Sequence, residues 1–169
     1  IYDNIRKAIQ FLLSANLAEV VSIFIADIMG FTILRPVHLL WINLVTDCLP
    51  AVALGLEKSE KGVMHRPPRK ASDGIFAGGM GADMIWQGAV IALLTLAAYF
   101  VGHFMESGRL EIAESPDGIT MAFLTMSMCE IFHSFNMRSR RNSIFKMPHN
   151  NKYLWGAMIL SLICTTAVI

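Results

Sequence analysis

The chain has 169 residues, of which 54% are hydrophobic and 16% are charged, and its formal net charge is +1. A mean hydropathy of +0.52 is too high for an ordinary soluble domain. The composition therefore predicts a multi-pass integral membrane protein, and no nucleic-acid partner is expected. Cys48, Cys129 and Cys164 lie in apolar runs without CxxC spacing, so neither a zinc site nor a disulfide framework is predicted.

Apolar runs of membrane-spanning length recur along the chain. At about 1.5 Å per residue, about twenty helical residues cross a hydrocarbon core of about 30 Å. Gly30 and Pro36 interrupt the pattern after the first run, and Pro36 suits the first turn of the next helix. We expect an all-α transmembrane bundle of about five spans, at about 8–29, 37–56, 82–104, 118–135 and 153–169. The short connection predicts that the first two spans form an antiparallel hairpin.

Charged residues are segregated between the two sides of these spans. All of the 14 basic residues except Arg35 and Arg109 fall on one side, mainly in the loops 57–79 and 137–152. The loop between the third and fourth spans is acidic. The positive-inside rule predicts that the basic loops and the N-terminus are cytoplasmic.

The second span contains a carboxylate inside the stretch LLWINLVTDCLP. Asn43, Thr46 and Asp47 are spaced i, i+3 and i+4, so their side chains share one face of a helix. Pro50 has no N–H, so the Thr46 carbonyl loses its usual helical donor. These groups are hard oxygen donors of the kind that Ca²⁺ binds in sets of about six to eight.

A packing role is the alternative for these polar residues. Asn43 and Thr46 could each serve as polar contacts between membrane helices, and Pro50 could be an ordinary kink. Asp47 fits that interpretation poorly, because an aspartate at mid-span costs about 2.5–3.5 kcal/mol to insert. We therefore interpret Asp47 as a functional residue.

Two other spans also contain a carboxylate. In the first span Asn16 and Glu19 are spaced i and i+3, at the same depth as the polar face of the second span. We infer that Glu19 and the second span share an ion site. The alternative is that Glu19 stays protonated and only forms a hydrogen bond with a neighbouring helix. The fourth span contains Ser127 and Glu130.

The stretches SANLAEVVSIF, LLWINLVTDCLPAVALGLE and VMHRPPRK, in this order, resemble the C-terminal membrane region of P-type calcium-transporting ATPases of the sarcoplasmic-reticulum-like class. The resemblance implies a pump of ten membrane helices, of which this chain forms the fifth to the ninth. It also implies that ATP and Mg²⁺ bind to cytosolic domains outside this chain, which has no DKTG phosphorylation motif. The implied partners are those domains, the remaining helices and the lipid bilayer.

The resemblance also implies Ca²⁺ as the transported ion, with Mn²⁺ as a companion, and a set of ligands: Asn16, Glu19, Asn43, Thr46 and Asp47. Asp47 would bridge two ion sites. The fourth span departs from the family, because Ser127 is aligned where two-site pumps have a glutamate. Glu130 would then lie one turn further toward the cytoplasm and reach the site only if its helix unwound or rotated. We therefore expect one calcium ion per cycle, with Ser127 and Glu130 as further possible ligands.

Two other classes of protein could place carboxylates in a membrane. A secondary cation transporter or channel predicts inverted repeats, and the two halves of this sequence show none. A scaffold protein would use its polar residues only to hold helices together, but amides and hydroxyls would suffice for that. We expect a pump in the plasma membrane of a prokaryote.

Overall fold

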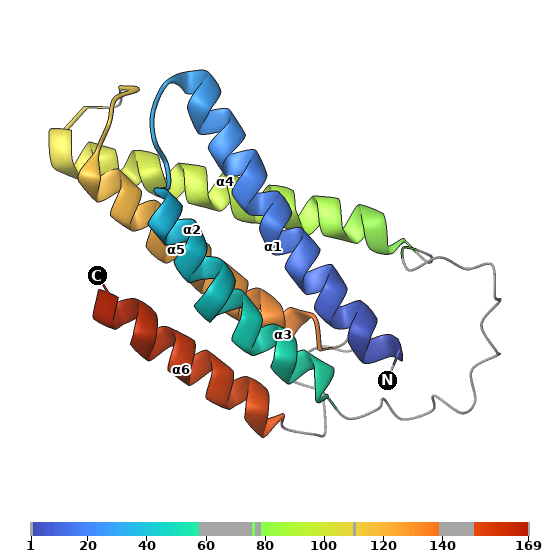
Figure 1. The fold of residues 1–169 in the computed structure, drawn as a ribbon. Coiled ribbons are helices and arrows are strands. Elements are labelled where there is room, and N and C mark those ends of the chain that lie inside the picture. Colours follow the sequence, from blue (N-terminus) through green and yellow to red (C-terminus); the bar gives the residue numbers. More distant parts are fainter. Residues whose placement is uncertain (1, 58–75, 77–78, 110, 139–150, 169) are drawn as a thin grey trace.

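The computed structural model describes residues 2–57, 76, 79–109, 111–138 and 151–168, and every regular element within them is helical. Figure 1 shows the bundle they form. The prediction of an all-α bundle is confirmed. The elements are α1 (Tyr2–Met29), α2 (Pro36–Trp41), η1 (Ile42–Asp47), α3 (Cys48–Gly55), α4 (Met80–Ser107), α5 (Pro116–Asn136) and α6 (Lys152–Val168).

The second long helix is built from three consecutive segments. It starts at Pro36, as predicted, and its central segment η1 is a π-helix between the α-helical segments α2 and α3. A π-helix has i→i+5 hydrogen bonds and is frequently found at functional sites. Pro50 lies just after this segment and has no N–H, so it can bind neither the Thr46 carbonyl in α geometry nor the Val45 carbonyl in π geometry. The sequence predicted the missing donor but not the π-helix.

Three helical stretches of the described chain are long and apolar enough to cross a membrane: α1, the composite helix Pro36–Gly55, and α4. α5 has 21 residues but is not among these three stretches, and α6 is apolar with 17 residues. Both are predicted spans, so the scheme of five crossings remains a prediction.

Glycines allow α4 to approach its two main neighbours closely. A Cβ atom at Gly88 would lie 2.9 Å from the Ser14 carbonyl oxygen of α1, and one at Gly102 would lie 2.8 Å from the Asp117 carbonyl oxygen of α5. Such contacts are possible only without a side chain, as is common between membrane helices. They fix α4 against both α1 and α5.

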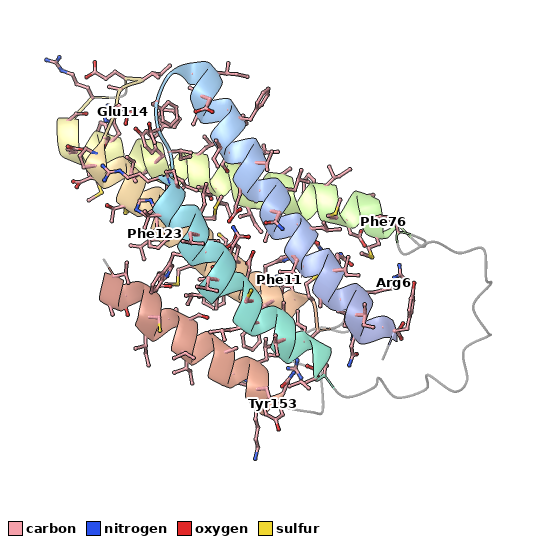
Figure 2. All side chains as sticks on the ribbon, in the orientation of Figure 1. Arg6, Phe11, Phe76, Glu114, Phe123 and Tyr153 are labelled. Atoms are coloured by element: carbon pink, nitrogen blue, oxygen red, sulfur yellow. The ribbon has the colours of Figure 1, made fainter. Side chains whose placement is uncertain are left out.

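The acidic and basic sides of the chain lie at opposite ends of the bundle. At one end, the Thr32 amide after α1 donates to a carboxylate oxygen of Glu114 at 2.8 Å. Figure 2 shows Glu114 at this end and Arg6 and Tyr153 at the other. Most of the predicted basic loops 57–79 and 137–152 lies outside the described residues, but the helices that flank them end at the side of Arg6 and Tyr153.

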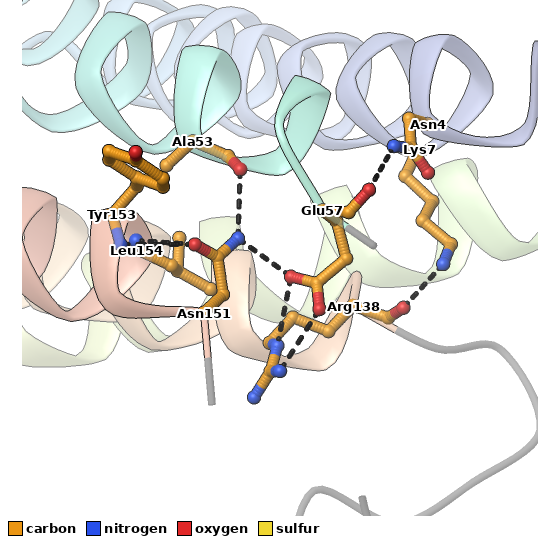
Figure 3. Close-up of polar contacts among 8 residues, drawn as sticks. All are labelled: Asn4, Lys7, Ala53, Glu57, Arg138, Asn151, Tyr153 and Leu154. Carbon is orange, nitrogen blue, oxygen red and sulfur yellow. Dashed lines mark hydrogen bonds and ion pairs between the residues drawn. The ribbon is translucent and has the colours of Figure 1, made fainter. Parts of the chain in front are cut away.

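A buried ion pair joins α3, α5 and α6 at this basic end (Figure 3). Arg138 donates from Nε and Nη2 to the two carboxylate oxygens of Glu57, at 3.2 and 3.0 Å. Both side chains are less than a tenth exposed. The Asn151 amide nitrogen donates to Glu57 at 2.7 Å and to the Ala53 carbonyl at 2.9 Å. Asn151 also caps α6, because its side-chain oxygen accepts from backbone amides of the first turn.

The N-terminal turn of α1 binds the same cluster. The Lys7 ammonium donates to the Arg138 carbonyl at 2.6 Å, and the Asn4 amide nitrogen donates to the Glu57 carbonyl at 2.5 Å. These contacts tie α1 to the ends of α3 and α5. The sequence analysis did not identify this cluster, because each contact between its helices joins residues more than 50 positions apart in the chain.

Candidate cation site

An amide and a carboxylate join α1 to η1 near the middle of the bundle. The Asn43 side-chain nitrogen donates to Oε1 and Oε2 of Glu19, at 2.9 and 3.0 Å. The same nitrogen lies 2.9 Å from the Leu39 carbonyl, one turn earlier in its own helix. The structure therefore brings together two of the predicted ligands from different spans.

Asp47 is 1% exposed, and neither of its carboxylate oxygens has a hydrogen-bond partner within the described residues. It lies close enough to Glu19 and Glu130 for electrostatic interaction with both. Burying a carboxylate without a partner is very unfavourable, unless a proton or a cation compensates the charge. This arrangement suits a residue that binds a cation.

Glu130 of α5 faces the same cluster. The Thr46 hydroxyl lies 2.8 Å from the Ile42 carbonyl and 3.3 Å from Oε2 of Glu130, so it can donate its hydrogen to either. Glu130 is fully buried, and its other oxygen has no partner in the described chain. We expected Glu130 to reach the site only if its helix unwound or rotated. α5 is a regular helix through this position and already places Glu130 within hydrogen-bond distance of Thr46, so whether Glu130 is a ligand stays a prediction.

Ser127 lies on α5 one turn before Glu130. It is fully buried, and its hydroxyl has no hydrogen-bond partner in the part of the chain that the structure describes. No hydrogen bond within the described residues links it to Asp47 or Thr46, so its place in the site remains a prediction.

Asn16 is a second predicted ligand that the structure does not link to the cluster. Its side chain is exposed on α1, whereas that of Glu19 is buried, and no hydrogen bond joins it to the cluster within the described residues. The i, i+3 spacing placed Asn16 and Glu19 on one face, but only Glu19 points at η1.

The donor set of this cluster is mixed. No three His, Cys, Asp or Glu side chains among the described residues are close enough to hold a metal ion by themselves. A cation site here would therefore combine carboxylates with the Asn43 amide oxygen, the Thr46 hydroxyl and backbone carbonyls. Such mixed oxygen sets are typical of Ca²⁺.

α6 supplies a contact to η1 that the sequence analysis missed. The Ser161 hydroxyl donates to the Val45 carbonyl at 3.0 Å, and Ser161 is fully buried. A single serine in an apolar helix gives no signal in the sequence, because serine commonly bonds within its own helix.

Comparison with known proteins identifies the family. The model of the family "Cation transporting ATPase, C-terminus" matches residues 31–169. The whole chain aligns with calcium-transporting ATPase 1 of Bacillus cereus at 39% identity and with the calcium-transporting ATPase of Bacillus subtilis at 35%. Calcium-transporting ATPase 1 of Lactococcus lactis is 36% identical over 96% of the chain.

The alignments cover only 20%, 18% and 18% of these relatives, so the chain spans about a fifth of their length. The family model, in contrast, covers most of the chain. The chain is part of an integral membrane protein and belongs to the family of cation-transporting ATPase C-terminal regions.

Proposed function

We propose that this chain is the membrane part of an ATP-driven calcium pump, in which it supplies oxygen ligands to a cation site between α1, η1 and α5. One observation carries the proposal: Asp47 is buried with both carboxylate oxygens unpaired in the described chain, within range of electrostatic interaction with Glu19 and Glu130. The names of the bacterial relatives support calcium as the transported ion, with Mn²⁺ as a companion.

The proposed ligands are Glu19, Asn43, Thr46, Asp47 and Glu130. The carboxylates supply charge that offsets the lost hydration of a divalent ion, and the amide and hydroxyl oxygens complete part of its shell. Asn43 can do two things at once, because its nitrogen holds Glu19 while its oxygen is available to a cation. Asn16 and Ser127 remain predicted ligands without a contact to the cluster.

The energy for transport would come from ATP and Mg²⁺ bound by other domains of the full-length protein. In this scheme the chain's own residues bind the ion, exclude water from it and release it when the helices move. The basic end, with Lys7 and Arg138, would face the cytoplasm by the positive-inside rule. The bacterial relatives support a prokaryotic plasma membrane.

ATP-driven uptake of radiolabelled calcium tests this proposal. The full-length protein is reconstituted into sealed vesicles, and uptake is measured with and without ATP. We expect uptake that requires ATP and is lost in an Asp47→Asn variant. Uptake driven by an ion gradient alone would instead indicate a secondary transporter or a channel, and would refute the pump.

A further inference from the structure

We propose that Ser161 of α6 is a positioning residue that holds η1 in its π-helical form, and thereby sets the calcium affinity of a site to which α6 contributes none of the proposed ligands. The effect on calcium affinity rests on the proposed function. The effect on the π-helical form of η1 does not depend on it.

The local chemistry of η1 creates the need for an outside donor. Pro50 follows the π-helix and has no N–H. In π geometry an N–H at position 50 would donate to the Val45 carbonyl, and Pro50 cannot make this i→i+5 bond. Buried backbone carbonyls are almost always paired. In this structure a hydroxyl from another helix fills the role, because Ser161 donates to the Val45 oxygen at 3.0 Å.

The direction of this hydrogen bond is unusual for a helical serine. Hydroxyls in helices commonly donate to a carbonyl three or four residues earlier in the same helix. Ser14 and Thr166 do so here, at 2.8 Å from the Gln10 and Leu162 carbonyls respectively. Ser161, in contrast, is fully buried and crosses to η1.

A second contact one turn further along α6 supports the same role. Thr165 is fully buried, and its hydroxyl oxygen accepts from the Trp41 indole nitrogen at 3.4 Å. Trp41 is the residue that immediately precedes η1. α6 therefore binds the π-helix at its start and in its interior. Figure 1 shows α6 running alongside the composite helix.

The consequence concerns the spacing of the ligands. A π-helix adds a residue to the turn, so it decides how Asn43, Thr46 and Asp47 are arranged around the axis. If η1 relaxed to α geometry, Asp47 would rotate relative to Glu19 and Glu130. Ser161 thus affects the ion through the backbone of η1.

The test compares Ser161→Ala, Ser161→Thr and Thr166→Ala in the full-length protein. The first removes the hydroxyl, the second keeps it, and the third removes an exposed hydroxyl of the same helix that binds only its own backbone. Two readouts are measured: amide hydrogen exchange of the peptide that contains residues 42–49, and the calcium concentration that gives half-maximal phosphorylation by ATP.

We expect Ser161→Ala to exchange about threefold faster over this peptide and to need about threefold more calcium, as for one hydrogen bond between membrane helices. Ser161→Thr and Thr166→Ala should match the wild type in both readouts. Unchanged exchange in Ser161→Ala, or exchange in Ser161→Thr as fast as in Ser161→Ala, overturns the proposal, as does unchanged calcium affinity in a calcium-responsive pump. A wild-type protein without any calcium response refutes the proposed function instead, and hydrogen exchange then decides the role of Ser161 in η1 alone.

Discussion

The side-chain nitrogen of Asn43 lies 2.9 and 3.0 Å from the two carboxylate oxygens of Glu19, so one amide joins η1 to α1. A charge-assisted contact of this kind is stronger than a neutral hydrogen bond. It orients the Glu19 carboxylate and leaves the amide oxygen of Asn43 for another partner. Two helices that are separate in sequence are thereby set in register at the depth of Asp47.

This contact predicts unequal roles for the two asparagines. Asn43→Ala removes the donor to Glu19 and should raise the calcium concentration for half-maximal phosphorylation about tenfold, since a hydrogen bond to a charged group contributes roughly 1.5–3 kcal/mol. Asn16→Ala should have a much smaller effect, because Asn16 is exposed. Equal losses in the two variants would show that Asn16 is a ligand completed by other parts of the pump.

Asp47→Asn should abolish calcium-dependent phosphorylation while leaving expression unchanged. The amide keeps the shape of the side chain but removes the charge that compensates a divalent cation. Asp27→Asn is the matched control, because Asp27 is exposed on α1. Calcium-dependent phosphorylation at the wild-type level in Asp47→Asn would remove Asp47 from the site.

Glu130 and Ser127 are separated by one turn of α5, and their substitutions should differ in effect. Glu130→Gln removes a charge beside Thr46 and Asp47, so we expect at least a tenfold loss of calcium affinity. Ser127→Ala should change it by less, about two- to tenfold, because a neutral hydrogen bond contributes about 0.5–1.5 kcal/mol. A larger loss in Ser127→Ala than in Glu130→Gln would reverse these assignments.

The position of Glu130 also bears on ion stoichiometry. The expectation of a single calcium ion assumed that α5 presents only Ser127 to the site. Because Glu130 faces Thr46 in this structure, the single-ion expectation now depends on whether Glu130 binds the ion. Equilibrium binding of calcium to the full-length protein decides the number, and two ions per pump would refute the single-ion expectation.

The pattern of residues close together in the sequence was sufficient to predict the helices and the polar faces of the first two spans. The long apolar runs, Pro36 at a helix start, and the i, i+3, i+4 spacing in the second span all follow from residues near each other in the chain. The pairing of Glu19 with Asn43 could also be expected, because a short connection places the two spans side by side. The same reasoning did not hold for Asn16, because the i, i+3 spacing alone does not say which of the two residues points at the neighbouring helix.

Features that depend on contacts between distant segments could not be predicted. The π-helix contacts Ser161, which is 116 residues from Val45, and the orientation of Glu130 depends on how α5 packs against η1. The pair of Glu57 and Arg138 lies 81 residues apart. In the sequence both residues belong to charged ends of helices, where solvent exposure is the usual outcome.

The buried pair of Glu57 and Arg138 leads to a prediction about stability. Arg138→Gln leaves the Glu57 carboxylate buried with Asn151 as its remaining side-chain partner among the contacts described above, and loss of one partner of a buried ion pair typically costs about 3–5 kcal/mol. We expect the full-length protein to unfold more readily in denaturing detergent. Arg109→Gln, at an exposed position, should change the free energy of unfolding by less than about 0.5 kcal/mol.

A double-mutant cycle separates the pair from the packing of the arginine stem. Glu57→Gln and Arg138→Gln are measured singly and together. If the ion pair holds α3 to α5, the double variant should lose less stability than the sum of the single losses, by about 1–3 kcal/mol, because neither charge is then left buried alone. Additive losses would mean that the two side chains act independently, and that the hydrogen bonds of Lys7 and Asn151 are sufficient to join these helix ends.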